Sequence, residues 1–516
     1  MTGRQLDVIG FLSSPASYGD DVESVQTHET HASIVFLAGS YAFKLKRAVR
    51  YPYLDYSTVE RRKAMCEREV GLNRLTARQI YLGVRSIVAR RDGSLAFGDA
   101  EDSLPAVDWV VVMKRFDEDC LFGSLRKAGR LTVEVARALG SVIADFHLAA
   151  ESVGDRSGAA EIAAVLDENV SMLRQSSAFA RGVVEHLDTQ ARDALLQLKP
   201  LLNRRARSGF VRRCHGDLHL DNICLVDGRP VLIDAIEFND DFTCIDVLFD
   251  LAFPLMELLR HRLVPQANAL LNRYIERTGD HGGLAALPLF QSCRAAIRAH
   301  VALARMKLEK DGGARQHDLA EANAYLCEAT KLLAPRNPRL IAVGGVSGTG
   351  KSTLAYALAP SVLPRPGAIV IRSDITRKSL LAVSETTRLP ASAYTDAMHA
   401  HVFGLMARHA EIALTGGFSV ILDGVYGDEG QRERLRNLAR ACGVPFDAFW
   451  LEAGQQALQD RIGARKTDAS DATPEVLRRQ LASVRSPDDW RVIDATAGPE
   501  TVLAEALRYL SLDRIS

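Results

Sequence analysis

The stretch LIAVGGVSGTGKSTLAYALA (340–359) most constrains how this chain can fold. An apolar run, a glycine-rich loop and a helical pattern follow one another, and the loop GVSGTGKS (345–352) fits the pattern G-x-x-x-x-G-K-[ST]. Glycines allow backbone N–H groups to surround phosphates, and the start of a helix adds a favourable dipole. The segment therefore predicts a strand, a phosphate-binding loop and a helix.

Further apolar strands, separated by helical segments, are expected at 368–372, 418–423 and 446–451. Strands that alternate with helices imply a parallel sheet covered on both faces, so an α/β fold is expected for this part of the chain. Before it, the two prolines of PRNPR (335–339) disfavour a helix. We place a domain boundary there, between residues 1–335 and 338–516.

The residue types of the glycine-rich loop indicate how it would hold a nucleotide. Lys351 would reach the β- and γ-phosphates of ATP, and Ser352 would ligate Mg²⁺. The remaining groups expected around the phosphates belong to Gly345, Ser347, Gly348, Thr349, Gly350 and Thr353. The structural alternative is a glycine turn that precedes a helix and binds nothing.

Four polar residues further along are candidates for phosphoryl transfer. Asp374 follows the strand 368–372, at the sheet edge where ligands bind, and it could orient or deprotonate an acceptor hydroxyl or cap the next helix. Asp423 ends the following strand and is suited to the Mg²⁺ shell. Arg461 and Arg465 are four residues apart. They suggest either a lid that neutralises the transferring phosphoryl group or a solvated helix face.

This region resembles the small P-loop kinases, namely the gluconate kinase-like, shikimate kinase-like and zeta-toxin-like proteins. The resemblance covers about residues 338–516 and rests on the glycine-rich loop, the run SDITRK (373–378) and the late arginines. It implies transfer of a phosphoryl group from ATP to a small metabolite or a nucleotide sugar.

The first region carries a polar cluster, CHGDLHLDN (214–222), between apolar segments. Such groups are costly to bury unless they are hydrogen-bonded or bind something charged. Asp217 and Asn222 are five residues apart, the spacing of the H-R-D-x-x-x-x-N loop of protein kinases, with Gly216 in place of arginine. Asp234 follows twelve residues later at the end of an apolar strand. These groups could accept a hydroxyl proton and hold Mg²⁺, and a polar turn is the alternative.

The full pattern HGDLHLDNI....G...LIDAIEF resembles the aminoglycoside phosphotransferase and choline kinase families, whose α+β fold has two lobes like that of protein kinases. By this resemblance Asp217 is the catalytic base, Asn222 and Asp234 are metal ligands, and His215 holds the loop. The whole chain thus resembles a bifunctional fusion of an aminoglycoside phosphotransferase-like domain and a P-loop kinase.

The resemblance also calls for a lysine and a glutamate in an N-terminal lobe of about residues 1–113. Lys44 and Lys46 share one face of a strand, and we choose Lys44 because these families place theirs after an aromatic-apolar strand. Either Glu67 or Glu69 could pair with it. Glu69 fits better because an apolar residue follows it at helical spacing, and a surface charge is the alternative for each residue.

Other residues of this region receive secondary roles. Met113, in VVVMKRF, would contact adenine through the backbone, as at a kinase hinge. A full glycine-rich motif is missing ahead of Lys44, where Ser33 could contact phosphate. Asp246 and Asp250 are expected to brace the loop that follows the metal ligands.

Composition and charge limit the possible partners. The chain has 64 Lys and Arg against 64 Asp and Glu, so no overall basic field favours nucleic acid or an anionic membrane. The eight cysteines form no Cys-x-x-Cys pair, which favours reduced thiols over a zinc site or disulfides. Without a signal-like start or a run long enough to span a bilayer, we expect a cytoplasmic protein whose partners are small-molecule phosphate acceptors.

The expected function is ATP- and Mg²⁺-dependent transfer of phosphoryl groups to hydroxyls of small molecules by two kinase domains. A sugar, a sugar acid, an aminoglycoside-like compound or a nucleotide sugar would be the acceptor. Two alternatives remain open: one domain senses ATP and regulates the other, or a zeta-toxin-like domain is held in check by its neighbour.

Overall fold

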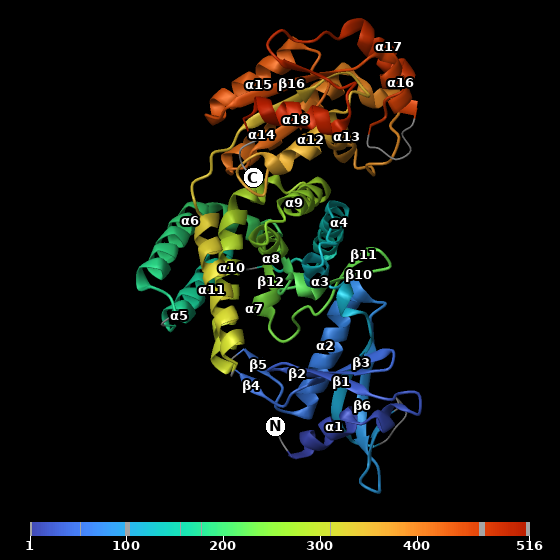
Figure 1. The fold of residues 1–516 in the computed structure, drawn as a ribbon, viewed down its shortest axis with the longest axis vertical. Helices are drawn as coiled ribbons and strands as arrows, with labels where there is room; N and C mark the ends of the chain where they lie inside the picture. Colours follow the sequence, from blue (N-terminus) through green and yellow to red (C-terminus); the bar gives the residue numbers. More distant parts are fainter. Residues whose placement is uncertain are drawn as a thin grey trace. The chain divides into compact units, whose positions relative to one another are not determined.

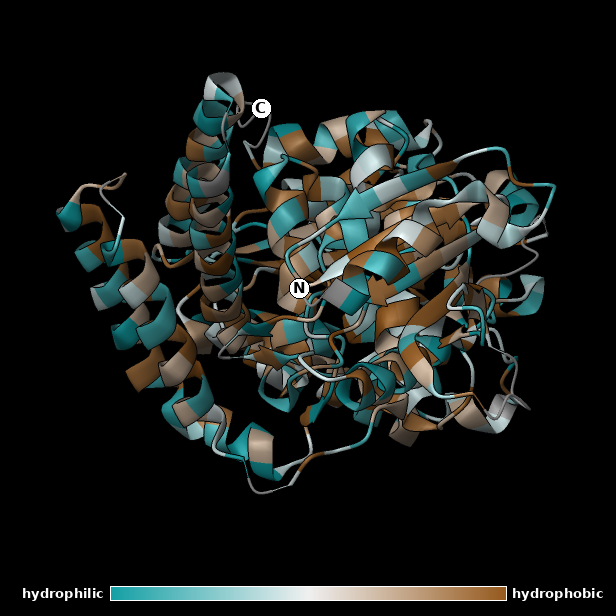
Figure 2. Cartoon of the chain, turned by 90° about the horizontal axis from the view of Figure 1, so that it is seen from below, coloured by the Kyte–Doolittle hydropathy of each residue, from teal (hydrophilic) through white to brown (hydrophobic). Residues whose placement is uncertain are grey.

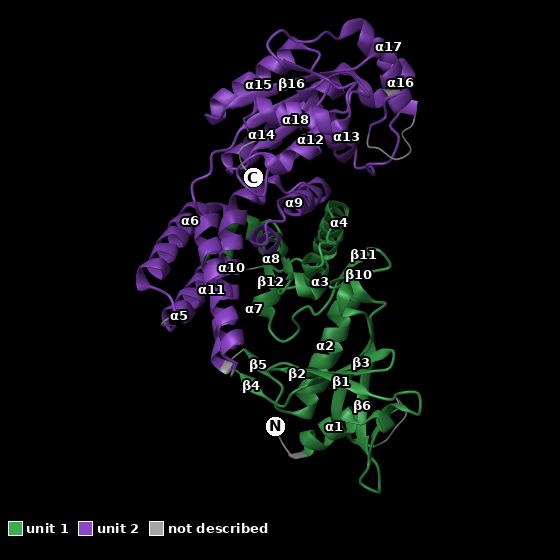
Figure 3. Cartoon of the chain, viewed as in Figure 1, with its two compact units in different colours: residues 1–161, 202–254 green, residues 162–201, 255–516 purple. Residues whose placement is uncertain are grey.

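The computed structural model describes residues 3–51, 53–98, 104–154, 156–176, 178–309, 311–463 and 470–511. The chain divides by packing into two compact units (Figure 3). The first consists of Met1–Glu161 and Leu202–Pro254, and the second of Ile162–Leu201 and Leu255–Ser516. The boundary at 335–339 stays a prediction, because this grouping follows contacts and places the helices that precede it with the C-terminal sheet.

The first unit begins with helix α1 (Gly3–Ser13) and an antiparallel sheet of order β1-β2-β3-β8-β6-β7 (Figure 1). Its strands are β1 (Val25–Glu29), β2 (Ser33–Ala38), β3 (Tyr41–Lys46), β6 (Tyr81–Ala89), β7 (Leu95–Phe97) and β8 (Ala106–Lys114). A short pair, β4 (Arg50–Tyr51) and β5 (Leu54–Asp55), leads to helix α2 (Val59–Ala77).

Strand β3 has two different faces because successive side chains point to opposite sides of a sheet. Phe43 and Leu45 pack in one apolar cluster with residues of α1. Ala42 packs in another with Cys66 and Val70 of α2. The lysines at 44 and 46 share the face of Ala42, so the alternation directs them toward α2.

The polar loop of the first unit lies between short elements. Strand β9 (Val211–Arg213) pairs with β12 (Cys244–Asp246), and a turn η3 (Leu220–Asn222) leads into the hairpin of β10 (Ile223–Val226) and β11 (Arg229–Leu232). The hairpin turn is Asp227–Gly228, both at positive φ, as a two-residue hairpin turn requires. The helices around it are α3 (Phe122–Lys127), α4 (Val133–Ala149) and α7 (Asp240–Thr243).

Three helices, α5 (Gly158–Arg174), α6 (Arg181–Arg207) and α8 (Val247–Arg260), each contribute residues to both units. The long helices show alternating apolar and polar bands (Figure 2), as amphipathic helices do. Among the described residues, no helix is long and apolar enough to cross a membrane.

The second unit holds a five-stranded parallel sheet of order β14-β15-β13-β16-β17. The strands are β13 (Leu340–Gly344), β14 (Ile369–Arg372), β15 (Val420–Asp423), β16 (Phe446–Glu452) and β17 (Arg491–Asp494). The parallel sheet confirms the fold class expected from the sequence. All residues of β13, β14 and β15 are buried, as in a sheet covered on both faces.

Helices surround this sheet and extend the second unit. The first three are α9 (Val264–Thr278), α10 (Leu287–Leu308) and α11 (Gly312–Leu332). The others are α12 (Lys351–Leu358), α13 (Ser373–Leu380), α14 (Asp396–Thr415), α15 (Glu429–Cys442), α16 (Gln455–Gly463), α17 (Pro474–Ser483) and α18 (Pro499–Tyr509).

Helix α9 completes the edge of the parallel sheet. Strand β14 lies at that edge, and edge strands present unpaired backbone groups. The buried Asn268 and Asn272 donate their amide hydrogens to the carbonyl oxygen of Ala368, at 3.1 and 3.0 Å. In return, Val370 N–H donates to Oδ1 of Asn272 at 2.7 Å. A helix that precedes the sheet in the sequence therefore supplies partners to its edge strand.

We predict that Asn272→Ala destabilises the C-terminal sheet, because it leaves a buried N–H of β14 without its partner. The expected loss is about 1–3 kcal/mol. It would be measured as a lower urea midpoint, followed by the fluorescence of Trp450 and Trp490. Asn323→Ala is the matched control, because Asn323 is exposed and bonds only within its helix. Equal shifts for both variants would contradict the role of Asn272.

Candidate active sites

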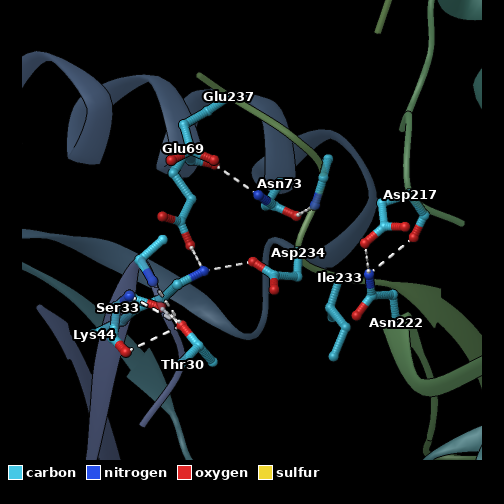
Figure 4. Close-up of polar contacts among 12 residues, drawn as sticks. Thr30, Ser33, Lys44, Glu69, Asn73, Asp217, Asn222, Ile233, Asp234 and Glu237 are labelled. Atoms are coloured by element: carbon cyan, nitrogen blue, oxygen red, sulfur yellow. Dashed lines mark hydrogen bonds and ion pairs between the residues drawn. The ribbon is translucent and has the colours of Figure 1, made fainter. Parts of the chain in front are cut away.

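The first site is built around Lys44 on β3 (Figure 4). Its ammonium lies 2.9 Å from Oε1 of Glu69 on α2 and 2.5 Å from Oδ1 of Asp234, which follows β11. Burial opposes the charge on Lys44, but these two carboxylates hold its pKa well above the usual range. The structure thus brings three predicted residues together. Glu67, the alternative partner, instead lies 3.8 Å from the exposed Lys63.

A second lysine, Lys46, shares Glu69 with Lys44. Its side chain is 1% exposed, its ammonium lies 2.6 Å from Oε2 of Glu69, and it also pairs with Glu237. Tyr56 donates its hydroxyl to the same oxygen of Glu237. Burial raises the pKa of Glu69, but the two lysines outweigh this and hold it at about 2. Glu237 and Tyr56 were not predicted from the sequence, although Glu237 lies within the LIDAIEF motif.

The backbone around Asp234 is held by side chains of the N-terminal lobe. Asp234 has φ of +61°, a left-handed conformation that costs a non-glycine residue roughly 1–2 kcal/mol. Its N–H donates to the Tyr81 hydroxyl at 3.0 Å, and Ala235 N–H donates to Oδ1 of Asn73 at 2.9 Å. Asn73 in turn donates to the backbone oxygen of Glu69 at 2.9 Å. These bonds hold the metal-ligand candidate in one orientation.

Asp217 and Asn222 form the other side of this site (Figure 4). Asn222 donates its amide to the backbone oxygen of Asp217 at 2.8 Å and to its Oδ2 at 3.3 Å. Ile233 N–H donates to the backbone oxygen of Asn222 at 2.9 Å, so Asn222 and Asp234 lie at the same end of the β10–β11 hairpin. Two carboxylates and an amide oxygen are ligand types that Mg²⁺ accepts, so this donor set fits the ion.

Asp250, on α8, holds the polar loop in place by hydrogen bonds. Its two carboxylate oxygens accept the N–H groups of His215 and Gly216, at 3.0 and 2.9 Å. Burial lowers the pKa of His215, so the ring is neutral at physiological pH. A Cβ at Gly216 would approach a backbone oxygen to 2.8 Å, which explains the glycine at this position. Asp246 forms a buried ion pair with Arg205 at 2.7 Å, so both aspartates hold structure in place.

Two further candidates of the N-terminal lobe, Met113 and Ser33, contact other residues of the protein. Met113 is buried in β8, where it faces Ala42 on one side and Tyr81 on the other. Ser33 is buried at the start of β2, and its N–H donates to Oγ1 of Thr30 at 3.0 Å. Contacts of these residues with adenine and phosphate stay predictions.

The second site begins at the glycine-rich loop between β13 and α12. Gly345, Gly348 and Gly350 have φ of +135°, +90° and +89°, conformations that favour glycine. A Cβ at Gly345 would lie 2.5 Å from a backbone oxygen of β16. Thr349 Oγ1 and Lys351 Nζ both donate to the carbonyl oxygen of Val346, at 2.9 Å each. Internal bonds therefore support the shape of the loop.

Polar residues at the carboxyl ends of neighbouring strands complete the second site. Ser352 donates its hydroxyl to Oδ2 of Asp423 at 2.5 Å, and Arg372 lies 3.4 Å from the same oxygen. Burial raises the pKa of Asp374, with a further contribution from Asp423, while Arg372 and Lys351 act against the shift. The predicted metal ligands and the candidate base thus lie at the edge where parallel sheets bind ligands.

The remaining candidates of the second site are spread around the loop. Ser347 N–H donates to the side chain of Gln480 at 2.7 Å, and Thr353 is exposed on α12. Arg461 donates to the carbonyl oxygen of Ala495 at 2.8 Å. Arg465 lies outside the described residues.

Two further cations, Arg377 and Lys378, end the SDITRK run and were not predicted from the sequence to have a role. Both are buried, at 2% exposure each. Arg377 donates to the carbonyl oxygen of Ala393 at 2.9 Å, while Lys378 donates to that of Glu385 at 2.8 Å and to Asp471 at 3.3 Å. These bonds position the segment between α13 and α14. The signal for them was the run itself, which places two cations three and four residues after Asp374 on one short helix.

Comparisons with known proteins agree with two kinase modules. The family model described as "Phosphotransferase enzyme family" matches residues 123–290, and the model described as "AAA domain" matches residues 340–487. An uncharacterized protein of Mycobacterium tuberculosis strain H37Rv is 32% identical over 488 residues, which is 93% of this chain and 94% of that protein. The module composition thus confirms the two-domain fusion expected from the sequence.

Solved structures align with one part of the chain each. A sugar kinase from Janibacter sp. HTCC2649 is 22% identical, with a TM-score of 0.28, over 34% of this chain and 96% of that one. A choline/ethanolamine kinase family protein from Mesorhizobium loti is 13% identical, with a TM-score of 0.38, over 64% of this chain and 99% of that one. Similarities at this level carry no information on the substrate.

We predict that Glu69 stabilises the protein in a pH-dependent way. Its pKa lies near 4.5 when exposed and at about 2 in the folded chain, so its contribution is complete above pH 4.5 and is lost as the pH falls toward 2. Glu69→Gln should therefore be less stable than the wild type by on the order of 3 kcal/mol at neutral pH. This difference, measured by denaturant unfolding, should shrink in acid.

Glu67→Gln provides the matched control, because Glu67 is exposed on the same helix. Its effect should be small at every pH. A difference between the wild type and Glu69→Gln that stays constant down to strongly acidic pH would show that Glu69 carries no depressed pKa.

Proposed function

The chain belongs to the same family as the Mycobacterium tuberculosis protein. We propose that it is a phosphotransferase with two ATP- and Mg²⁺-dependent sites that act on hydroxyls of small molecules. One observation carries the proposal: each module contains a lysine and two candidate oxygen ligands for a metal. These are Lys44 with Asn222 and Asp234, and Lys351 with Ser352 and Asp423. ATP·Mg²⁺ requires cations for its phosphates and oxygen ligands for its metal.

In the first module, Lys44 would hold the α- and β-phosphates, and Glu69 would fix the orientation of its ammonium. Asn222 and Asp234 would hold Mg²⁺, which when bound would neutralise charge on the transferring phosphoryl group. Asp217 would accept the proton of the attacking hydroxyl as the hydroxyl oxygen bonds to the γ-phosphorus. The bond from that phosphorus to the β–γ bridging oxygen would break, and ADP would leave. The hydrogen bond from Asn222 supports this role, since it keeps the Asp217 carboxylate beside the metal-ligand candidates.

In the second module, the loop N–H groups and Lys351 would surround the phosphates, while Ser352 and Asp423 would hold the metal. Asp374 would be the base, and its raised pKa brings it closer to the range in which general bases work well. Arg461 and Arg465 would neutralise the transferring group. Suitable acceptors for the two modules are sugars, sugar acids, aminoglycoside-like compounds and nucleotide sugars.

The setting that best suits this activity is the cytoplasm. All eight cysteines are free thiols, as expected in a reducing compartment. The chain carries no net charge, so neither nucleic acid nor an anionic membrane is proposed as a partner.

A second candidate function is favoured by the contact of α9 with β14. The asparagines of α9 bond to the strand that carries Arg372 and leads directly to Asp374. Movement of this helix would therefore reach the second site. In this version one module senses ATP and regulates the other, and only one of them makes product.

We predict that Asp217→Asn and Lys351→Ala each abolish one activity. Asp217→Asn removes a general base, a change that lowers rates by about 100-fold or more. Wild type and variants would be incubated with ATP·Mg²⁺ and a metabolite library, and new phosphorylated masses would be followed. If the two modules are independent kinases, each variant should lose one of two products. If one module senses ATP, the wild type should make one product, and both substitutions should change the rate at which it forms. An absence of any phosphorylated product in the wild type would refute the proposal.

A further inference from the structure

A cavity of about 600 Å³ lies in the second unit, apart from the residues assigned above. It opens between the last residues of α8 and α11, the connection at 334–336, and residues 364–365. Its volume lies within the range of small-molecule sites, which is roughly 300–1,000 Å³.

This cavity is distinct from the phosphate loop. Pro335 and Arg336 precede β13, and Pro364 and Arg365 precede β14, so the cavity adjoins the amino-terminal ends of the strands. The phosphate loop follows the carboxyl end of β13. A strand of this length spans about 15 Å, which separates the two ends of the sheet.

The cavity concentrates positive charge in a chain whose formal net charge is zero. Only Glu328 opposes the basic residues of its lining, which are Arg260, Arg262, Lys331, Arg336 and Arg365. Among the residues that the structure describes, no carboxylate is within ion-pairing distance of any of these cations. Burial raises the pKa of Glu328, while Lys331, Arg365 and Arg260 act against this shift.

Two of these cations are held in place by the protein. Arg336 donates to the carbonyl oxygens of Gly417 and Arg365, at 2.8 and 2.9 Å, and lies over the ring of Phe418. Burial lowers its pKa to about 10, so it remains charged at physiological pH. Arg260 lies over a tyrosine ring at 4.2 Å, and its Nε is shielded from solvent without a hydrogen-bond partner in the described structure.

The other three cations, Arg262, Lys331 and Arg365, are exposed around the cavity. Lysine and arginine often occur at helix C-termini because they interact favourably with the helix dipole. That explanation covers only Arg260 and Lys331, which lie in the last turns of α8 and α11. Arg262, Arg336 and Arg365 lie outside helices, so helix stabilisation does not account for their position.

We propose that this cavity binds a small anion with two or more phosphate groups, at a site separate from both transfer centres. Guanidinium and ammonium groups bind phosphate oxygens by charge-assisted hydrogen bonds, and five cations opposed by a single carboxylate suit more than one phosphate. Nucleoside di- and triphosphates and bisphosphorylated products of small molecules share this chemistry.

The test measures binding of radiolabelled inorganic pyrophosphate to the full chain by equilibrium dialysis. The pocket variant is Arg262→Gln/Lys331→Gln/Arg365→Gln, in which only exposed side chains change. The matched control, Arg90→Gln/Arg91→Gln/Arg434→Gln, loses the same charge from exposed positions elsewhere. We expect the affinity of one site to fall at least tenfold in the pocket variant and to stay unchanged in the control.

Further measurements with Lys351→Ala and with unlabelled competitors test the proposal. Lys351→Ala should weaken a different site and leave the pocket site intact, which separates this inference from the proposed kinase function. If a nucleotide is the ligand, unlabelled ADP should displace pyrophosphate from the pocket site. If a bisphosphorylated product is the ligand, a sugar bisphosphate should displace it and ADP should not. Equal binding by the pocket and control variants, or displacement by monophosphate as effective as by pyrophosphate, would overturn the proposal.

Discussion

The buried pairing of Lys46 with Glu69 and Glu237 is the interaction on which the first site depends. Removing one partner of a buried ion pair leaves an uncompensated charge and costs about 3–5 kcal/mol. Strand β3, helix α2 and the segment after β11 each contribute one of these residues, so they are stable together in one arrangement. Glu69 then remains ionised for Lys44, which contacts Asp234.

In the second module, the backbone supplies part of the positive potential that lysines supply in the first site. Loop N–H groups and the start of α12 supply positive potential there, and glycines at positive φ allow the loop to close. The candidate oxygen ligands are Ser352 and Asp423, which lies at the carboxyl end of its strand. The edge strand of this sheet is completed by α9, a helix that lies before the boundary expected from the sequence. The edge of this sheet is therefore bonded to residues that precede the predicted boundary.

Both candidate sites could be predicted from the sequence because many of their residues lie at fixed short spacings. The motif GVSGTGKS predicted the phosphate-binding loop, and the spacing between Asp217 and Asn222 predicted the polar loop. Alternation along a strand could not separate Lys44 from Lys46, and both in fact contact Glu69. The bond between Tyr81 and Asp234 was missed because it joins residues 153 positions apart. Tertiary packing creates such contacts without a local pattern.

The central claim is that the two modules each bind ATP through separate, magnesium-dependent sites. The most direct measurement is a calorimetric titration of the full chain with a non-hydrolysable ATP analogue, with Mg²⁺ and with a chelator. We predict two saturable sites per chain that require Mg²⁺. One such site, or none, would contradict it.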